Sequence, residues 1–166
     1  MRLVPATVAM IRAEIADRVA FAEMLGAVVP ADWPPESAAD AVPWFLEQLE
    51  IDPIGRARWL AYYGIAENGV LVGGAGFKGP PVDGMVETGY SVLPAHQRQG
   101  YATEMVGALV EWAMAQPGVL RVIADTDENN APSLRLLSNL GFVAIGAGAE
   151  PGCIRFERTG SRQALA

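Results

Sequence analysis

The segment Ser91–Thr103 carries the residues best suited to binding an anion. It lies between a segment typical of a strand and one typical of a helix, and a helix N-terminus presents unpaired N–H groups and the positive end of the helix dipole. Gly100 has no side chain to block a close approach, Ala102 has only a methyl group, and Arg98 adds a positive charge. The pattern predicts a phosphate site, but taken alone it also fits an ordinary helix start.

Periodicity predicts the elements that must position this segment. Segments typical of strands are 59–65, 70–77, 86–93, 119–126, 142–145 and 154–157, with a hairpin turn at Glu67-Asn68-Gly69. Segments with helical periodicity are Val8–Leu25 between a Thr7 cap and a Gly26 stop, Glu36–Leu49, a stretch from Gln99 to the Pro117 stop, and a stretch from the Asn130 cap to Gly141. The segment Ser91–Thr103 therefore connects a strand to a helix.

Length, charge and composition exclude several classes of protein. The chain has 166 residues, the size of one ordinary domain, so a single domain over 1–166 is expected. Its formal net charge of −7 argues against nucleic acid as a partner. No apolar run approaches the roughly 20 residues that span a bilayer. One cysteine, Cys153, and one histidine, His96, cannot supply a zinc site by themselves. A cytoplasmic protein without membrane or metal is expected.

Two motifs resemble those of the GNAT superfamily of acyl-CoA-dependent N-acyltransferases. The phosphate loop of that family has the pattern Q/R-x-x-G-x-G/A, which is matched by Gln97, Gly100 and Ala102. The ribosomal-protein-alanine-acetyltransferase-like branch has N-x-x-S followed by G-F, to which the chain is similar at Asn130, Ser133 and Gly141-Phe142. The motifs occur in the expected order over about residues 59–158, with the expected elements around them.

The resemblance implies an α+β fold and a coenzyme. The implied sheet is mixed and mostly antiparallel, with about six to seven strands and about four helices, and strands 86–93 and 119–126 splay apart. The implied cosubstrate is acetyl-CoA, with its pantetheine arm between those strands. Backbone groups of Val92 and Leu93 are implied to pair with pantetheine, and one of their amides to polarise the thioester carbonyl. The residues implied to hold the pyrophosphate or contact the coenzyme are Arg98, Gln99, Gly100, Tyr101, Ala102, Thr103 and Asn130.

The reaction needs a base, because an amine with a pKa near about 10.4 is protonated at neutral pH. Glu87 is the expected base, since related enzymes carry a carboxylate near this place on the strand that leads into the phosphate loop. The alternative is a glutamate on a solvated strand face. Strand parity places Glu87, Gly89 and Ser91 on one face of the sheet unless a bulge intervenes.

The departing thiolate needs a proton or a hydrogen bond. Many family members use a tyrosine four residues before the Gly-Phe pair, where this chain has Leu137. Ser133 is the expected substitute, because the alanine-acetyltransferase-like branch has a serine at the matching position. The alternatives are that Ser133 bonds free backbone N–H groups in the first helical turn, or that the thiolate leaves without a dedicated acid.

The loop Trp33-Pro34-Pro35-Glu36, between the first two expected helices, falls where the family forms its acceptor-amine site. Trp33 belongs to that site or, alternatively, packs as a lid on the core. Between Glu14 and Asp52 the chain has nine acidic residues and, as its single basic residue, Arg18. If part of this negative charge faces the cleft it would attract a cationic amine, whereas such charges more often lie on solvated helix faces. The glycine-rich run 73–79 predicts a strand against which a ligand or backbone packs closely.

The sequence therefore predicts an acetyl-CoA-dependent N-acetyltransferase. It would act on a primary amine, either a protein N-terminus or a small amine, by direct attack without a covalent enzyme intermediate. The alternative is a catalytically silent acyl-CoA-binding module that senses the coenzyme or regulates a partner. A homodimer is common in the family and is a further expectation.

Overall fold

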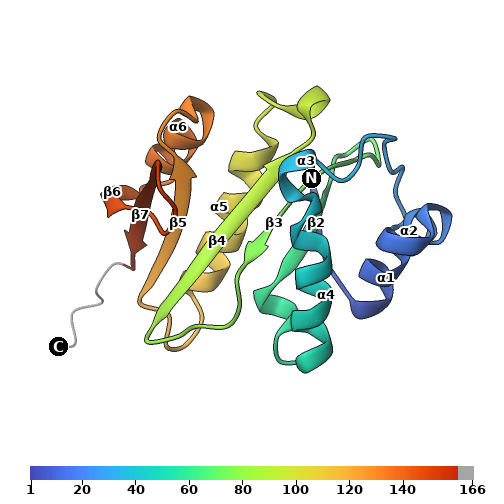
Figure 1. Cartoon of the computed structure of the whole chain (residues 1–166), viewed down its shortest axis with the longest axis horizontal. Coiled ribbons are helices and arrows are strands. Elements are labelled where there is room, and N and C mark those ends of the chain that lie inside the picture. Colours follow the sequence, from blue (N-terminus) through green and yellow to red (C-terminus); the bar gives the residue numbers. More distant parts are fainter. Residues whose placement is uncertain (161–166) are drawn as a thin grey trace.

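One mixed sheet organises the computed structural model, which describes residues 1–160 (Figure 1). Its strands lie in the order β1-β2-β3-β4-β5-β7-β6, and neighbours pair antiparallel except β4 with β5. The strands are β1 (Arg2–Pro5), β2 (Ala61–Ile65), β3 (Leu71–Phe77), β4 (Met85–Val92), β5 (Arg121–Asp127), β6 (Val143–Ala147) and β7 (Cys153–Thr159). The expected α+β fold class is confirmed; residues 161–166 of the expected single domain lie outside the described part.

Helices cover both faces of the sheet. They are α1 (Val8–Ala16), α2 (Arg18–Leu25), α3 (Glu36–Ala39), α4 (Ala41–Ile51), α5 (Tyr101–Met114) and α6 (Ala131–Asn139). Helices α1, α2 and α4 pack with β2 in one apolar cluster, and α5 packs with β3, β4 and β5 in another. No helix within residues 1–160 is long and apolar enough to cross a membrane.

The first expected helix, 8–25, is two helices. Thr7 caps its start and Gly26 ends it in a left-handed conformation, as predicted. Asp17 interrupts it, because its backbone is extended and its carboxylate accepts hydrogen bonds from the N–H groups of Val19 and Ala20. A short acidic side chain competes in this way with the helical backbone bonds and starts a new helix.

The second expected helix, 36–49, is also divided, into α3 and α4. A continuous helix from Glu36 would require an N–H group at residue 43 to bond the carbonyl of Ala39, and Pro43 has none. When the helix restarts at Ala41, Pro43 lies in its first turn, where the missing donor costs nothing. Four expected helices are therefore found as six segments.

The other elements lie close to their expected bounds, with two differences. Strand β1 was not expected; it is four residues long and lies at the sheet edge, where Pro5 is tolerated. The expected start of the second strand, at residue 59, belongs instead to a short 3-10 helix, Ala57–Trp59. The Asn130 cap is confirmed, because its side chain accepts a hydrogen bond from the N–H group of Ser133.

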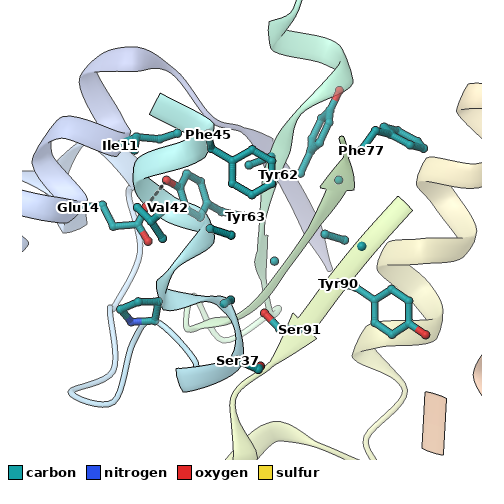
Figure 2. Close-up of a pocket in the computed structure, with 18 of the residues that line it drawn as sticks. Ile11, Glu14, Ser37, Val42, Phe45, Tyr62, Tyr63, Phe77, Tyr90 and Ser91 are labelled. Carbon is teal, nitrogen blue, oxygen red and sulfur yellow. Dashed lines mark hydrogen bonds between the residues drawn. The ribbon is translucent and has the colours of Figure 1, made fainter. Parts of the chain in front are cut away.

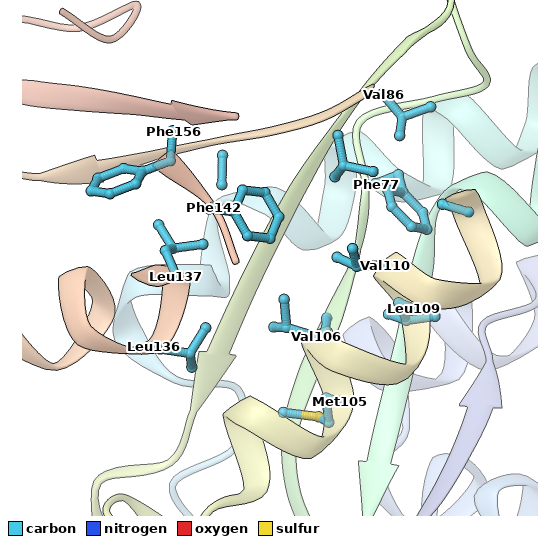
Figure 3. Close-up of a cluster of buried hydrophobic side chains, with 14 of the residues drawn as sticks. Phe77, Val86, Met105, Val106, Leu109, Val110, Leu136, Leu137, Phe142 and Phe156 are labelled. Carbon is cyan, nitrogen blue, oxygen red and sulfur yellow. The ribbon is translucent and has the colours of Figure 1, made fainter. Parts of the chain in front are cut away.

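The core beneath α5 explains why the phosphate-loop helix is held firmly against the sheet. Met105, Val106 and Val110 of α5 are fully buried, and Leu137 of α6 is equally inaccessible (Figure 3). Phe142 and Phe156 close this cluster from the C-terminal strands. Helix α5 therefore holds the segment that precedes it in a defined position at the end of β4.

Strands β4 and β5 separate as expected. Their parallel pairing covers Met85–Glu87 of β4 against Arg121–Ile123 of β5 and does not continue toward their C-terminal ends. On their other sides, both strands stay paired, β4 with β3 and β5 with β7. Figure 1 shows the two strands diverging above this point.

Gly76 of β3 permits the close approach of Leu60, the residue that precedes β2. A methyl group built on Gly76 would lie 2.0 Å from the carbonyl oxygen of Leu60, whereas one built on Gly89 of β4 meets nothing within 4 Å. Gly76→Ala should therefore lower the free energy of unfolding by roughly 1–3 kcal/mol, since backbone must move to admit the methyl group. Gly89→Ala is the matched control, and equal melting temperatures for the two variants would contradict this packing.

Candidate functional site

Alternate N–H and C=O groups of β4 face the opening between β4 and β5. Glu87 accepts a hydrogen bond from the N–H group of Lys78, and Leu93 donates one to the carbonyl of Val72, each at 2.9 Å. In an antiparallel ladder the residues between such positions direct their N–H and C=O groups to the other side. The backbone groups of Tyr90 and Val92 therefore face the opening, where β5 no longer pairs with β4.

This alternation distinguishes the two residues expected to meet pantetheine. The N–H group of Leu93 is already bonded to the carbonyl of Val72. Of the two amides expected to polarise the thioester carbonyl, the one that remains a candidate is therefore that of Val92. The carbonyl of Val92 accepts a hydrogen bond from the Gln97 side chain at 3.1 Å, which braces the loop that follows. Tyr90, which was not expected, presents a second backbone position to the opening.

The segment after β4 leads into the N-terminus of α5, and its residues from Arg98 to Thr103 are called the cradle below. Gly100 is the N-cap residue, at φ +87°, and no side chain caps the helix there. The N–H groups of Tyr101, Ala102 and Thr103 therefore belong to the first turn, where a helix has no internal acceptor for them. A Cβ atom on Gly100 would meet nothing within 4 Å, so the approach to these N–H groups is open.

The residues around Gly100 are shaped to leave that approach clear. Arg98 adopts φ +59°, and Arg98 and Gln99 are both exposed. The amide of the Gln99 side chain donates to the carbonyl of Ala95 at 3.2 Å, which ties the loop together. A turn of this kind, with an exposed guanidinium beside a helix N-terminus, fits the pyrophosphate of a coenzyme.

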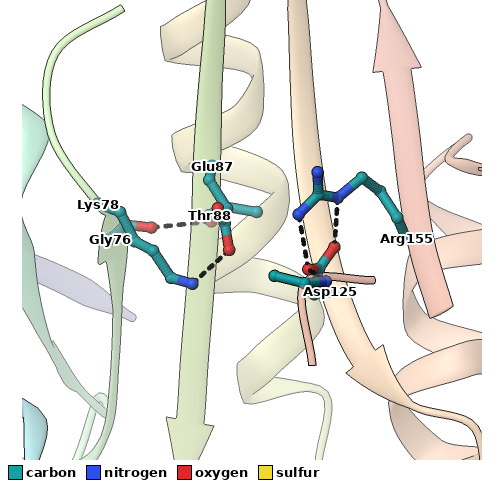
Figure 4. Close-up of polar contacts among 7 residues, drawn as sticks. Gly76, Lys78, Glu87, Thr88, Asp125 and Arg155 are labelled. Carbon is teal, nitrogen blue, oxygen red and sulfur yellow. Dashed lines mark hydrogen bonds and ion pairs between the residues drawn. The ribbon is translucent and has the colours of Figure 1, made fainter. Parts of the chain in front are cut away.

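Glu87 lies where the pairing of β4 with β5 ends. Its carboxylate is paired with the ammonium group of Lys78 and is 20% exposed (Figure 4). The next residue, Thr88, is buried on the opposite face and donates to the carbonyl of Gly76 at 2.9 Å. Strand parity is therefore as predicted, because Glu87 shares its face with Gly89 and Ser91.

A second ion pair lies on the same face, across the opening. Arg155 of β7 donates to both carboxylate oxygens of Asp125, at 2.7 and 2.8 Å (Figure 4). These hydrogen bonds hold the pKa of Asp125 below its usual range, and Asp125 in turn raises the pKa of Arg155. The pair was not predicted, because it joins residues 30 positions apart in sequence, and it fixes β5 to β7 while β4 diverges.

Ser133 and Tyr90 meet across the opening. The two hydroxyl groups are joined by a short hydrogen bond, and the Ser133 side chain is buried. Burial raises the pKa of the Tyr90 phenol, and its hydrogen bond to Ser133 opposes that shift. Leu137, which stands where many relatives have tyrosine, is fully buried and points into the core. A phenol is thus present beside Ser133, supplied by β4 instead of α6.

Asn130 lies at the N-terminus of α6, beyond the C-terminal end of β5. Because β4 and β5 run parallel, this residue and the cradle around Gly100 lie at the same edge of the sheet (Figure 1). The side-chain oxygen of Asn130 is committed to capping α6. Its side-chain N–H₂ group is a further hydrogen-bond donor, and the residue is exposed.

A pocket of about 310 Å³ lies on the face that carries α1 and α4 (Figure 2). Its floor is formed by strands whose residues lack bulky side chains there, Gly74, Gly76 and Gly89. Its walls are largely apolar and include Ile11, Val42, Phe45 and Phe77. Residues 73–77 of the glycine-rich run lie in β3, and backbone packs closely against them, whereas 78–79 follow the strand. At one end the pocket reaches Tyr90 and Ser91 of β4.

Glu14 of α1 lies at the other end of this pocket. Its two carboxylate oxygens accept hydrogen bonds from the indole N–H of Trp33, at 2.7 Å, and the phenol of Tyr63, at 2.5 Å. Burial raises the pKa of Glu14, and the two hydrogen bonds partly offset that shift. Burial and the neighbouring carboxylate together raise the pKa of Tyr63.

Trp33 and the acidic residues of the N-terminal third differ in their relation to the pocket. Trp33 is buried, as the lid interpretation expects, and it also lines the pocket. Of the nine acidic residues from Glu14 to Asp52, Glu14 lines the pocket and the other eight are exposed. The negative charge that faces the pocket is therefore one carboxylate.

His96 and Cys153 belong to different elements. His96 belongs to a short 3-10 helix before the cradle, with its ring 6.4 Å from that of Tyr101. Cys153 is the first residue of β7. The pKa of its thiol is raised, first by loss of solvent around it and then by four surrounding carboxylates. Within residues 1–160 no three histidine, cysteine or acidic side chains are grouped so that they could hold a metal ion.

Comparison with known proteins identifies a family. The chain matches a family described as the acetyltransferase (GNAT) domain over residues 8–143. It is 33% identical, over 129 residues and 76% of each chain, to the uncharacterized N-acetyltransferase YjdG of Bacillus subtilis (strain 168).

Solved structures share the fold. Spermidine N-acetyltransferase from Vibrio cholerae, in complex with CoA and spermine, superposes with a TM-score of 0.59 at 14% identity, over 72% of this chain and 74% of that chain. Ribosomal-protein-S5-alanine acetyltransferase from Vibrio fischeri superposes with a TM-score of 0.64 at 16% identity, over 96% and 93% of the two chains. At these identities the likeness concerns the fold.

Proposed function

The chain belongs to the GNAT family of N-acetyltransferases, and we propose that it transfers an acetyl group from acetyl-CoA to a primary amine by direct attack. The observation that carries this proposal is the opening between β4 and β5. It ends at the N-terminus of α5, where no side chain caps the helix and the N–H groups of the first turn can bind phosphate. Acetyl-CoA would supply a thioester carbonyl as the electrophile. The chain's own groups then have three tasks: binding, polarisation and proton transfer.

Binding falls to the cradle and to β4. The N–H groups from Arg98 to Thr103 are proposed to hold the pyrophosphate, with Asn130 as a further donor from the opposite side of the opening. The N–H group of Val92 faces the opening and would donate to the thioester oxygen as negative charge develops on it. A fixed backbone donor of this kind stabilises the transition state more than the ground state.

Glu87 is the proposed base. It shares a sheet face with Gly89 and Ser91, which line the pocket, but is not itself part of the pocket wall. Lys78, its partner, lines the pocket. The carboxylate would therefore receive the amine's proton through an intervening water, while Lys78 keeps it oriented. The same ion pair would keep the Glu87 carboxylate at the pocket rim before the amine binds.

Ser133 is the proposed hydrogen-bond donor to the departing thiolate, and Tyr90 supports it. The phenol of Tyr90 can donate to the Ser133 oxygen, which leaves the serine proton free to point into the opening. The pair offers a proton path without the tyrosine that Leu137 replaces. It also joins β4 to α6 across the opening, so it would keep the two walls at a constant separation.

The acceptor and the finer branch are also proposals. The N-x-x-S and G-F motifs and the fold shared with the S5-alanine acetyltransferase support placement in the ribosomal-protein-alanine-acetyltransferase-like branch. The solved neighbours are named for acceptors as different as spermidine and a ribosomal-protein alanine. The acceptor must therefore be argued from this chain's pocket, because the architecture accommodates many amines.

A silent acyl-CoA-binding module is the second candidate. It is favoured by one observation: the Lys78 ammonium group occupies an oxygen of the Glu87 carboxylate, which is then not free to accept a proton from an amine. Release of free thiol from acetyl-CoA in proportion to added amine would eliminate this candidate.

Gly100→Glu should abolish acetyl-CoA binding, because its carboxylate would occupy the cradle and repel the pyrophosphate. Gly118→Glu is the matched control, since Gly118 has a similar backbone angle, φ +83°, and equal free space beyond the other end of α5. Calorimetric titration should show binding to the native protein and to Gly118→Glu but not to Gly100→Glu. Binding to all three proteins would remove the cradle from the site.

Glu87→Gln should lower kcat by roughly 100-fold, with little change in the Kd of acetyl-CoA, if Glu87 accepts the proton. Glu157→Gln is the control. Glu157 is in register with Glu87 across β5, and it too has a basic partner, Arg121. In Glu87→Gln alone the pH–rate profile should move to higher pH, because without a base only amine that is already unprotonated can attack. A profile that is the same in both variants would exclude Glu87 as the base.

Ser133→Ala should slow acetyl transfer by up to about tenfold, because the thiolate would lose its donor and Tyr90 its partner. Tyr90→Phe should cause a smaller loss, since Ser133 could still donate. Ser138→Ala, an exposed serine on the same helix, provides the control. Steady-state kinetics at saturating amine measure this, and native rates in Ser133→Ala would limit Ser133 to packing against Tyr90.

A further inference from the structure

Glu14 is a half-buried carboxylate without a positively charged partner. Within residues 1–160 it takes part in no ion pair, and its hydrogen bonds come from two neutral donors, Trp33 and Tyr63. The nearby arginines are engaged elsewhere: Arg12 with Glu50, and Arg18 with the carbonyl of Trp33. Two hydrogen bonds leave lone pairs of the carboxylate free to accept more.

The pocket beside Glu14 offers no cation to balance it. The basic side chain in the pocket lining is Lys78, and its ammonium group is paired with Glu87 at the other end. The walls between are aliphatic and aromatic, so an ammonium group bound at Glu14 would be shielded from water. A charged hydrogen bond in such surroundings is strong.

The sheet register gives the spacing between the two ends of the pocket. Tyr63, whose phenol holds Glu14, is paired with Gly74, and Gly74 is paired with Ser91 of β4. Two strand spacings separate Tyr63 from Ser91, which is about 10 Å. The amine that reacts must approach β4, because the proposed polarising group, the N–H of Val92, belongs to that strand. Because Glu14 lies at the tip of the Tyr63 side chain, a group at Glu14 is at least about 10 Å from the edge of β4.

We infer that Glu14 is the specificity residue of the acceptor site and that the acceptor is a diamine with an apolar spacer. One ammonium group is held by Glu14 among Trp33 and Tyr63. The hydrocarbon spacer lies on the floor formed by Gly74, Gly76 and Gly89. The second amine, unprotonated, reaches the edge of β4. This inference rests on the proposed acetyl transfer for the fate of the second amine but not for the binding of the first.

The apolar walls also argue against a charge in the middle of the acceptor. Val42 and Phe45 of α4 stand over the floor of the pocket (Figure 2), and neither could compensate an internal ammonium group. Octamethylenediamine, whose extended chain matches the span, is therefore the probe of choice. Spermidine, of similar length but with a charged nitrogen inside its chain, should bind more weakly.

The test is calorimetric titration of octamethylenediamine into the native protein, Glu14→Gln and Glu47→Gln, in the presence of CoA. Glu14→Gln keeps the shape and an acceptor oxygen but loses the charge, so its Kd should rise roughly 10- to 100-fold. Glu47→Gln removes an exposed acid from the same region and should bind like the native protein. Equal Kd values for all three proteins, or no binding by the native protein, would overturn the inference.

Acetyl transfer gives an independent readout. The native protein should show a kcat/KM for octamethylenediamine roughly 10- to 100-fold above that for octylamine, and Glu14→Gln should erase the difference by lowering the first value. A preference that survives in Glu14→Gln would contradict the assignment. If diamine binding depends on Glu14 but no amine is acetylated, the proposed function fails and the binding site stands.

A third variant guards against misfolding. If Glu14→Gln melts well below the native protein, Gly89→Val tests the pocket without touching the carboxylate. Its side chain would extend into open space on the pocket floor, and valine suits a strand. It should abolish diamine binding while leaving CoA binding intact, and native diamine affinity in Gly89→Val would overturn the inference.

Discussion

The loss of pairing between β4 and β5 after Glu87 is the constraint on which the rest of the structure depends. Each strand keeps its outer neighbour, so the sheet opens without falling apart. An opened strand must leave backbone groups without a sheet partner, which would be costly in a closed core. Here Tyr90 and Val92 direct those groups at a space that a pantetheine arm can fill. Helix α5, held by the core beneath it, places the cradle, which is the proposed phosphate site, at the end of the same strand.

The two faces of β4 carry different parts of the proposed reaction: departure of the thiolate on one face and binding of the amine on the other. On the face toward α5 and α6, the Tyr90–Ser133 hydrogen bond spans the opening on the side where the thiolate would leave. On the other face, Glu87 and Lys78 lie at the rim of a pocket whose far end is Glu14. A strand that alternates its side chains can serve both sides at once. Glycines at 74, 76 and 89 leave the room that the acceptor requires.

The sequence was most informative where a motif and an element boundary coincide. The cradle at Gly100, the Asn130 cap and the parity of Glu87 all depend on local chemistry, and the structure contains each of them. Local patterns could not reveal the break at Asp17 or the restart of the helix before Pro43, because both depend on hydrogen bonds that compete with helix periodicity. Contacts between distant segments were also missed: Tyr90 with Ser133, Asp125 with Arg155, and Glu14 with Tyr63. Each needs the strand order before the two residues can be seen as neighbours.

Amide hydrogen exchange with and without CoA would test whether the coenzyme lies between β4 and β5, because it reads individual backbone groups on both sides of the opening. New protection is expected at Tyr90 and Val92 and at the cradle from Arg98 to Thr103. Amides of β7, which stay within the sheet, should exchange at the same rate in both states. Protection confined to other segments, with the amides of Tyr90 and Val92 unchanged, would contradict the claim that the coenzyme lies between β4 and β5.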